Sequence, residues 1–582
     1  MKIMLTGINS KYIHTNLAIR YLYQNLLKLN EEVLIREYTI NQHMEELLKA
    51  IYEEQPDVIA ISCYIWNISL VHRLGRELKK VLPETWIILG GPEVEFGTRK
   101  IMEQEDYIDM VIKGAGEITL YELLRRLREN DSYHDMKNIA FRVRGKVIEN
   151  TEQSTHTFNS YAPFPYEGLL VDPNKIYYYE SSRGCPYNCE YCLSSSITGV
   201  SFLPMEKVQR ELDFFLSNKV KQVKFVDRTF NANKAHALGV MEYILENHNN
   251  HTNFHFEITA ELIDDDFITF LKKVPKGLFQ FEVGVQSTNP ETLSAINRRM
   301  NFESIKESLE ALVKLKNIHI HLDLIAGLPF EDYFTFRNSF NEVFSLGAEK
   351  LQLGFLKLLK GSELRKKAQE YGYVYTDGPP YEVLENQWID FTEILKLKDV
   401  ENLLEKYWND HRFPKTLNYV IQYRYKANAF KFFEDFSRYW KEKHLYEQSQ
   451  GKEFLYEIFL DFCQDQNFQE INFIQNLLRF DYLKQNKKRK TPKFLEVKSS
   501  KEKEQVWSKE EAHEFLQRPE NRKRYLLHTE EISAKKLIKK VHFEVFEFPI
   551  LSDAEYELMN LNQCKDSVIL FDYEHDRAHL VK

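Results

Sequence analysis

The chain has 582 residues, and 78 Lys and Arg against 87 Asp and Glu give a net charge of −9. This length predicts several domains, and a hydrophobic fraction of 43% excludes an intrinsically disordered chain. The acidic total argues against a protein that coats nucleic acid without selectivity. The most apolar stretch, residues 58–71, is interrupted by polar residues and is shorter than the roughly 20 residues that a bilayer span needs. With no signal peptide recognisable at the start, we expect a cytoplasmic protein with no membrane segment.

The first 150 residues alternate short apolar runs with longer amphipathic ones. Strands are expected at residues 2–6, 33–37, 58–63, 86–90 and 110–113, and helices at 15–29, with Thr15 as N-cap, and at 42–53. This alternation is typical of parallel βαβ units and predicts a doubly wound, Rossmann-like sheet, closed by a hairpin at residues 138–150. The loops after such strands lie at the carboxyl edge of the sheet, where ligands bind. We therefore assign residues 1–150 to a ligand-binding domain and residues 151–174 to a linker.

The β/α alternation then resumes over residues 175–367. Helices are expected at residues 205–217 and 305–315. Six repeats are too few for a closed eight-stranded barrel, so we predict a partial (β/α)6 barrel. Its six expected strands are residues 176–180, 222–226, 255–259, 280–285, 319–325 and 350–355.

The last region, residues 368–582, is mostly helical in period, with β-like runs at residues 541–546 and 567–573. Aromatic and basic residues interleave over residues 427–443, which fits either a packed helix with a charged solvated face or a surface that stacks nucleic acid bases. Residues 484–493 are rich in Lys and Arg and read as an exposed loop or as a polyanion contact. The sequence assigns this region no role.

Three of the six cysteines, Cys185, Cys189 and Cys192, follow the first barrel strand with the spacing C-x3-C-x2-C. Thiolates ligate iron–sulfur clusters, and a four-iron cluster with three protein thiolates leaves one iron open to a chelating small molecule. A structural zinc site would need four tetrahedral ligands, and no fourth Cys or His is nearby. We interpret the motif as an iron–sulfur site, with zinc or an inert structural role as alternatives. We assign no role to Arg183 and interpret it as a surface charge.

This motif resembles the signature of the radical S-adenosylmethionine (SAM) superfamily. Further matching segments are VKFVDRTFN at residues 223–231, FEVGVQS at 281–287 and DLIAGLP at 323–329, although Val-Asp-Arg replaces the usual Gly-Gly-Glu. The resemblance implies a [4Fe–4S] cluster that chelates SAM and cleaves it reductively to a 5′-deoxyadenosyl radical. For Asp227 and Glu282, strand-end capping or ion pairing is the alternative interpretation. The residues that the resemblance places in the SAM pocket are Asp227, Glu282, Gln286, Ile325, Gly327 and Leu356.

The first domain is similar to that of the cobalamin-binding subgroup of the same superfamily. The matching segments are SCYIWN at residues 62–67, ILGGPEVEF at 88–96 and KGAGE at 113–117. The Asp-x-His-x-x-Gly loop that often supplies a cobalt ligand is absent, so His14 is expected either to ligate cobalt or to form a hydrogen bond. The residues that the resemblance places around the cobalamin are Asn9, Ser10, Lys11, His14, Ser62, Trp66, Asn67, Gly90, Gly91, Pro92, Glu93, Gly114, Gly116 and Glu117.

Taken together, the resemblance implies a cobalamin-dependent radical SAM enzyme that methylates an unreactive carbon of an unknown substrate. It also implies a reducing electron donor, such as flavodoxin or ferredoxin, and an oxygen-poor cytoplasm. Two alternatives remain open: a non-methylating rearrangement or oxidation with the same cofactors, and a cobalamin and iron–sulfur redox sensor. A nucleic acid partner has only the aromatic and basic stretches of the last region in its favour.

Overall fold

The computed structural model describes residues 1–150, 158, 162–196, 199–487, 491–496, 507–527, 532–551 and 566–582. The chain forms two compact units, Met1–Ile394 and Leu395–Lys582. The first unit contains both predicted α/β regions, and the finer domain boundaries remain predictions. Across the described ranges, every helix is too short or too polar to cross a lipid bilayer.

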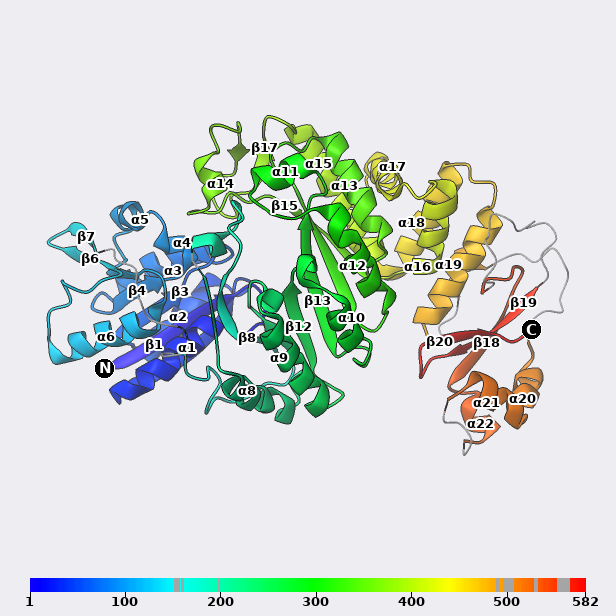
Figure 1. Cartoon of the computed structure of the whole chain (residues 1–582), viewed down its shortest axis with the longest axis horizontal. Helices are drawn as coiled ribbons and strands as arrows, with labels where there is room; N and C mark the ends of the chain where they lie inside the picture. The colour runs from blue at the N-terminus through cyan, green and yellow to red at the C-terminus, as the bar shows by residue number, and fades with distance from the viewer. Residues whose placement is uncertain are drawn as a thin grey trace. The chain divides into compact units, whose positions relative to one another are not determined.

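The N-terminal sheet has seven strands in the order β2-β1-β3-β4-β5-β6-β7. The first five are parallel and a β6–β7 hairpin follows them, as the sequence predicted, and this hairpin pairs antiparallel to β5. Figure 1 shows this sheet in blue to cyan at the N-terminal end of the chain. The strands are β1 (Lys2–Asn9), β2 (Glu32–Thr39), β3 (Val58–Ser62), β4 (Trp86–Gly90), β5 (Met110–Ile112), β6 (Ile139–Val143) and β7 (Lys146–Asn150).

Helices cover both faces of this sheet, which makes it doubly wound. Ile3 and Leu5 of β1 belong to one apolar cluster, and Met4 and Ile8 to the other, because successive side chains of a strand point to opposite faces. The helices are α1 (Leu17–Leu26), α2 (Met44–Glu54), α3 (Ile68–Val81), α4 (Pro92–Glu95), α5 (Thr98–Gln104) and α6 (Gly116–Glu129).

The N-cap of helix α1 lies one residue later than predicted. The Asn16 side chain caps it by accepting a hydrogen bond from the backbone N–H of Ile19. Thr15, the predicted cap, instead donates its hydroxyl to the carbonyl of Ile176 in the barrel. The sequence could not reveal this because the partner lies 161 residues away.

The second sheet of the first unit has six parallel strands in the order β15-β14-β13-β12-β11-β8, as predicted for a partial barrel. One face carries buried aromatic and aliphatic side chains, for example Tyr179, whose ring packs edge-on against Phe215 of helix α8 (Met205–Ser217). The strands are β8 (Ile176–Tyr179), β11 (Gln222–Phe225), β12 (Asn253–Ile258), β13 (Phe279–Gln286), β14 (His319–Ala326) and β15 (Lys350–Phe355).

Helices connect these strands, and two small antiparallel pairs, β9 with β10 and β16 with β17, accompany the sheet. The sequence analysis missed the β9–β10 hairpin, whose strands are only four residues long. The helices are α9 (Lys234–Asn247), α10 (Asp265–Leu271), α11 (Pro290–Ala295), α12 (Phe302–Lys314), α13 (Tyr333–Ser345) and α14 (Glu363–Lys366), and the short strands are β9 (Ser182–Cys185), β10 (Gly199–Phe202), β16 (Val374–Tyr375) and β17 (Val383–Glu385).

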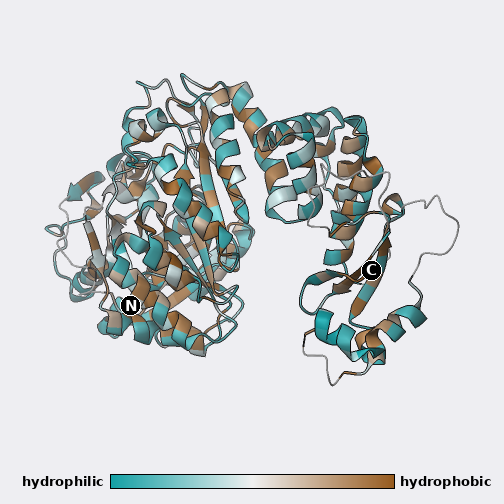
Figure 2. Ribbon diagram, turned by 45° about the vertical axis from the view of Figure 1, so that its right-hand side comes forward, coloured by the Kyte–Doolittle hydropathy of each residue, from teal (hydrophilic) through white to brown (hydrophobic). Residues whose placement is uncertain are grey.

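The C-terminal unit is mainly helical and includes one antiparallel sheet in the order β18-β19-β20. Its strands contain the two predicted β-runs. Figure 2 shows hydrophobic residues along these strands. The elements are α15 (Phe391–Leu403), which begins in the first unit, α16 (Pro414–Tyr419), α17 (Ala429–Glu442), α18 (Lys452–Asp465), α19 (Ile471–Gln485), α20 (Lys509–Gln517), α21 (Pro519–Tyr525), α22 (Ala534–Leu537), β18 (Val541–Phe546), β19 (Ser567–Asp572) and β20 (Arg577–Leu580).

The aromatic residues of α17 are core residues. Phe432, Phe436 and Trp440 are buried, and the Phe436 ring contacts Phe459 of α18. Rings that are packed inside the unit have no free face for a base, so the base-stacking interpretation of residues 427–443 is wrong and the helix-packing one is confirmed. Most of the basic stretch at 484–493 lies within the described residues, but residues 488–490 and Cys564 lie outside them.

Candidate functional site: the facing edges of two sheets

The cysteine motif begins on strand β9. Gly184 has φ +105°, and a Cβ there would lie 2.1 Å from the carbonyl oxygen of Gly199 on the paired strand β10. Only glycine fits both this left-handed backbone and this close approach. The hairpin therefore fixes the direction in which the chain leaves Cys185 and enters the loop with Cys189 and Cys192.

Each of the three sulfur atoms has a hydrogen-bonding neighbour. Cys185 Sγ lies 3.5 Å from the hydroxyl of Thr229, and Cys192 Sγ accepts from the backbone N–H of Ser194 at 3.4 Å. Cys189 Sγ accepts from Nη1 of Arg298 at 3.8 Å. Donors at sulfur stabilise the thiolate form, which is the form that binds metal.

All three cysteines are free thiols. Among the described residues, no three Cys, His, Asp or Glu side chains converge on a point that could hold one metal ion. A zinc site needs such convergence, whereas an iron–sulfur cluster takes each thiolate on a different iron. The donor set thus fits a cluster better than zinc.

Asp227, at the end of β11, anchors the start of the cysteine loop. It is fully buried and accepts hydrogen bonds from the Ser181 backbone N–H at 3.0 Å and from the hydroxyls of Ser181 and Ser182, both at 2.6 Å. His236 lies 3.0 Å from the Ser181 hydroxyl and completes the network. Burial raises the pKa of Asp227 to about 7, although these hydrogen bonds oppose the shift. Asp227 has no exposed surface, and its place in the SAM pocket stays a prediction.

The other five predicted SAM contacts separate into two groups. Gly327 and Leu356 are buried, and the Gly327 carbonyl accepts hydrogen bonds from Tyr373 and Asn386. Their SAM contacts stay predictions. Glu282, Gln286 and Ile325 are partly exposed on the sheet face opposite the helices, and they stay predictions.

Arg183 is a structural bridge, so its interpretation as a surface charge is wrong. Its guanidinium pairs with Glu117 at 2.9 Å and with Glu180 at 2.8 Å, and its side chain is only 19% exposed. The ring of Phe158 lies 4.4 Å from the guanidinium carbon. Glu117 lies in the first turn of α6, which follows β5, so this ion pair joins the carboxyl edge of the N-terminal sheet to the cysteine loop.

Two more segments at the same edge contact the barrel region. His14 Nδ1 lies 2.8 Å from the Tyr178 hydroxyl of β8. Glu93 is buried and accepts a hydrogen bond from the Tyr381 hydroxyl at 2.7 Å. The carboxyl edge of the N-terminal sheet therefore faces the cysteine loop and the barrel.

The predicted cobalamin contacts also separate by accessibility. Asn67, for example, is fully buried and donates to the carbonyls of Ile8 and Ser62, which is a loop-stabilising role. The buried members are Asn9, Ser62, Asn67, Glu93 and Glu117, which the structure uses in internal contacts. The members with accessible surface, which stay predictions, are Ser10, Lys11, His14, Trp66, Gly90, Gly91, Pro92, Gly114 and Gly116.

Trp66 offers an exposed flat surface at this edge. It is 45% exposed and stacks on Tyr64 with ring centroids 4.5 Å apart. Its indole N–H donates to the Ile8 carbonyl at 3.1 Å, which fixes the ring orientation. An exposed ring held in this way suits contact with a flat ligand.

Sequence reasoning missed Arg298. Besides Cys189, its guanidinium donates to the Gly284 carbonyl of β13, and its Nε is buried without a hydrogen-bond partner. It places a positive charge beside the predicted cluster. No local motif marks it, because Cys189 is 109 residues away in the chain.

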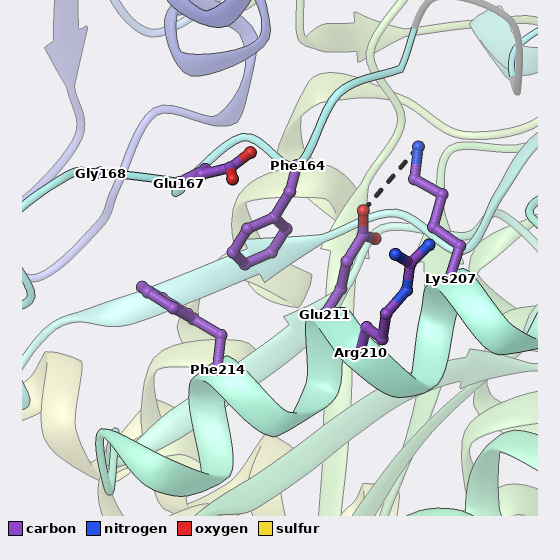
Figure 3. A pocket seen from close by; sticks show the side chains of 7 residues that line it. All are labelled: Phe164, Glu167, Gly168, Lys207, Arg210, Glu211 and Phe214. Carbon is purple, nitrogen blue, oxygen red and sulfur yellow. Dashed lines mark ion pairs between the residues drawn. The ribbon is translucent and has the colours of Figure 1, made fainter.

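A surface hollow of about 440 Å³ lies apart from these groups (Figure 3). Lys207 and Glu211 form an ion pair across it at 3.8 Å, and Glu211 also accepts from the Tyr179 hydroxyl at 2.7 Å. None of its lining residues is a predicted cofactor contact. They are Phe164, Glu167, Gly168, Lys207, Arg210, Glu211 and Phe214.

Comparison with known families agrees with this geometry. Residues 4–124 match the B12 binding domain and residues 179–343 match the radical SAM superfamily. Residues 369–571 match a family described as a protein of unknown function (DUF4080).

Curated relatives match only part of this chain. It is 26% identical over 319 residues to 2-(S-pantetheinyl)-carbapenam-3-carboxylate methyltransferase of Streptantibioticus cattleyicolor, which covers 50% of this chain and 45% of the relative. It is 26% identical over 358 residues to the cobalamin-dependent radical SAM methyltransferase TokK of Streptomyces tokunonensis, which covers 56% of this chain and 51% of that one. The chain thus spans about half the length of these relatives.

Solved structures share the fold. The radical SAM methyltransferase TsrM of Kitasatospora setae aligns with a TM-score of 0.56 and 16% identity, over 65% of this chain and 79% of TsrM. The cobalamin-dependent SAM radical enzyme OxsB aligns with a TM-score of 0.58 and 15% identity, over 82% of this chain and 79% of OxsB.

The chain therefore combines a B12 binding domain with a radical SAM domain. Its cofactors are cobalamin, SAM and a [4Fe–4S] cluster, as the sequence resemblance implied.

Replacing Arg183 with Gln should destabilise the first unit by about 3 kcal/mol, because it leaves Glu117 and Glu180 as unpaired, mostly buried carboxylates. Urea unfolding under anaerobic conditions measures the change. Arg210→Gln, on the exposed side of α8, is the control and should shift stability by less than about 0.5 kcal/mol. Equal stability of the two variants would contradict the bridging role.

The stability difference between the wild type and Asp227→Asn should depend on pH. Folded Asp227 keeps its proton up to about pH 7, whereas the unfolded chain releases it near the ordinary pKa of 3.8. The folded state thus binds more protons in this window, and wild-type stability relative to the variant should fall as pH rises through it. Paired unfolding curves between pH 5 and pH 8 provide the measurement, and a constant difference would contradict the account.

Proposed function

We propose that the protein is a cobalamin-dependent radical SAM methyltransferase that methylates an unreactive carbon. One observation carries this proposal: the ion pairs of Arg183 with Glu117 and Glu180 join the predicted cobalamin edge to the cysteine loop. A methyl donor and a radical source must act on the same carbon, so their sites need to face each other. The names of TokK and the carbapenam methyltransferase support the same activity.

When bound, the cluster and SAM supply a 5′-deoxyadenosyl radical, and cobalamin supplies the methyl group. The chain's own residues hold and orient these groups. Cys185, Cys189 and Cys192 are the proposed cluster ligands, and Arg298 places a positive charge beside Cys189. The exposed Trp66 ring is a proposed contact for the corrin face.

The proposal includes a one-electron donor, such as flavodoxin or ferredoxin, and a reducing cytoplasm. Reductive cleavage of SAM needs an external electron, and thiolate-ligated clusters persist where thiols stay reduced. The sequence-based expectation of an oxygen-poor compartment is kept on this basis.

A product assay tests the proposal. Anaerobically reconstituted protein with SAM and a strong reductant should form 5′-deoxyadenosine, and S-adenosylhomocysteine only when cobalamin is present. Cys189→Ala should lose both products because the cluster loses one of its three ligands. Cys463→Ala is the matched control, since Cys463 is buried within α18 of the other unit, and it should keep both products.

The product pattern separates the alternatives. Formation of 5′-deoxyadenosine without S-adenosylhomocysteine, in the presence of cobalamin, would favour a rearrangement or oxidation, or a methyltransferase that is idle without its substrate. Neither product from protein with a full iron complement would favour the redox sensor.

A further inference from the structure

The positive charge of this chain is concentrated in its last region. Residues 484–540 contain 18 Lys and Arg against 9 Asp and Glu, a net charge of +9, although the whole chain carries −9. The other residues therefore hold 60 Lys and Arg against 78 Asp and Glu, a net charge of −18. Such an asymmetry within one chain is typical of a local surface that binds a polyanion. The sequence analysis singled out only the first ten residues of this segment.

The described part of this segment includes helices that pack on the C-terminal sheet. Helices α20, α21 and α22 are grouped next to strands β18 and β19 (Figure 1), and an apolar cluster joins Leu516 of α20 and Leu537 of α22 to Leu570 of β19. Arg522 links the helices, because its guanidinium donates to the carbonyls of Leu516 and of Ile532, which precedes α22. Helices α21 and α22 are thus held side by side on one scaffold.

Helix α21, helix α22 and the turn after α22 present a basic face to solvent. Its five side chains are exposed, and none has an ion-pair partner among the described residues. Without counter-charges from the protein, these cations keep a positive potential at the surface. This basic face consists of Lys523, Arg524, Lys535, Lys536 and Lys539.

The carboxylates around the basic face do not cancel its charge. Glu514 of α20 pairs with Arg518 at 3.0 Å, and Glu574 pairs with Lys540 at 2.8 Å, so both are used by cations outside the basic face. When every carboxylate of residues 507–540 is counted, nine Lys and Arg stand against six Glu, a net charge of +3. The balance of this part of the unit is therefore positive.

The composition of the basic face favours one kind of polyanion. Helices that lie on membranes insert their apolar side among the lipids, whereas the apolar side of α22, with Ala534 and Leu537, is buried against the sheet. Protein interfaces are depleted in Lys, and four of the five residues of the basic face are Lys. Interfaces with nucleic acids are polar and strongly positive, because Lys and Arg bind phosphates. A nucleic acid backbone is therefore the ligand that fits.

We propose that the basic face binds the phosphate backbone of a nucleic acid and does not read its bases. Tyr525, the aromatic residue next to Arg524, packs against Phe515 and His579, and the Arg524 guanidinium carbon lies 5.2 Å from the centre of its ring. A ring with these neighbours is part of the fold and not a platform for a base. The inference goes beyond the proposed function and does not depend on it, because phosphate binding needs no turnover.

Fluorescence anisotropy with a labelled DNA duplex of about 20 base pairs tests this on the full chain, loaded with its cofactors under anaerobic conditions. Five phosphate contacts predict that the logarithm of the association constant falls with the logarithm of the salt concentration with a slope of about −4.5. Replacing the basic face with Gln should weaken binding at least about tenfold in about 50 mM salt and bring the slope close to zero. The substitutions are Lys523→Gln, Arg524→Gln, Lys535→Gln, Lys536→Gln and Lys539→Gln.

A second variant controls for the loss of positive charge itself. It replaces five exposed lysines of the first unit with Gln and should bind the duplex like the wild type. Both variants change only exposed side chains and should keep the wild-type circular dichroism spectrum. A wild-type slope close to zero would overturn the proposal without any variant, and so would equal affinities of the two variants. The control lysines are Lys219, Lys221, Lys272, Lys273 and Lys276.

Two other anions test the alternative partners in competition with the duplex. Polyglutamate of the same total charge should compete at least about tenfold more weakly than unlabelled duplex, because it releases fewer condensed counterions. Phosphatidylserine vesicles should also compete more weakly, because the basic face has its apolar residues buried. Polyglutamate that competes as well as the duplex would assign the basic face to an acidic protein, and vesicles that do so would assign it to a membrane. Either result would overturn the proposal.

Discussion

The first unit depends on the buried ion pairs of Arg183. A guanidinium with one carboxylate from each sheet region can be satisfied only when the two regions meet in one orientation, because its donors form a rigid planar fork. The contacts of His14 with Tyr178 and of Glu93 with Tyr381 add further fixed points along the same edge. Together they hold the segments that follow three strands of the N-terminal sheet against the barrel region.

The two faces of the barrel sheet have different roles. Its apolar face packs against helices and stabilises the fold, while its polar face carries partly exposed charged side chains such as Lys224 and Glu282. The cysteine loop starts at the end of the first barrel strand, anchored by Asp227 from the second. The predicted SAM contacts Glu282 and Gln286 lie on this polar face, and the facing N-terminal edge is where we expect the cobalamin.

The fold was largely predictable from the sequence, because strands such as 58–63 and 222–226 are short apolar runs separated by amphipathic stretches of ordinary length. The cysteine motif was predictable for the same reason: its chemistry lies in adjacent residues. The roles of Arg183, Arg298 and Asp227 were not, because each depends on partners from other elements. Asp227 matched a SAM-binding segment in sequence, yet its oxygens are fully used by Ser181 and Ser182.

The central claim is that the cobalamin edge and the cluster loop face each other, and electron paramagnetic resonance tests it most directly. Protein loaded with cob(II)alamin and a reduced [4Fe–4S] cluster contains two unpaired-electron centres. The account predicts a magnetic interaction between them that changes the relaxation of the cobalt signal, and that disappears in Cys189→Ala. Two independent signals, identical to those of protein with each cofactor alone, would contradict it.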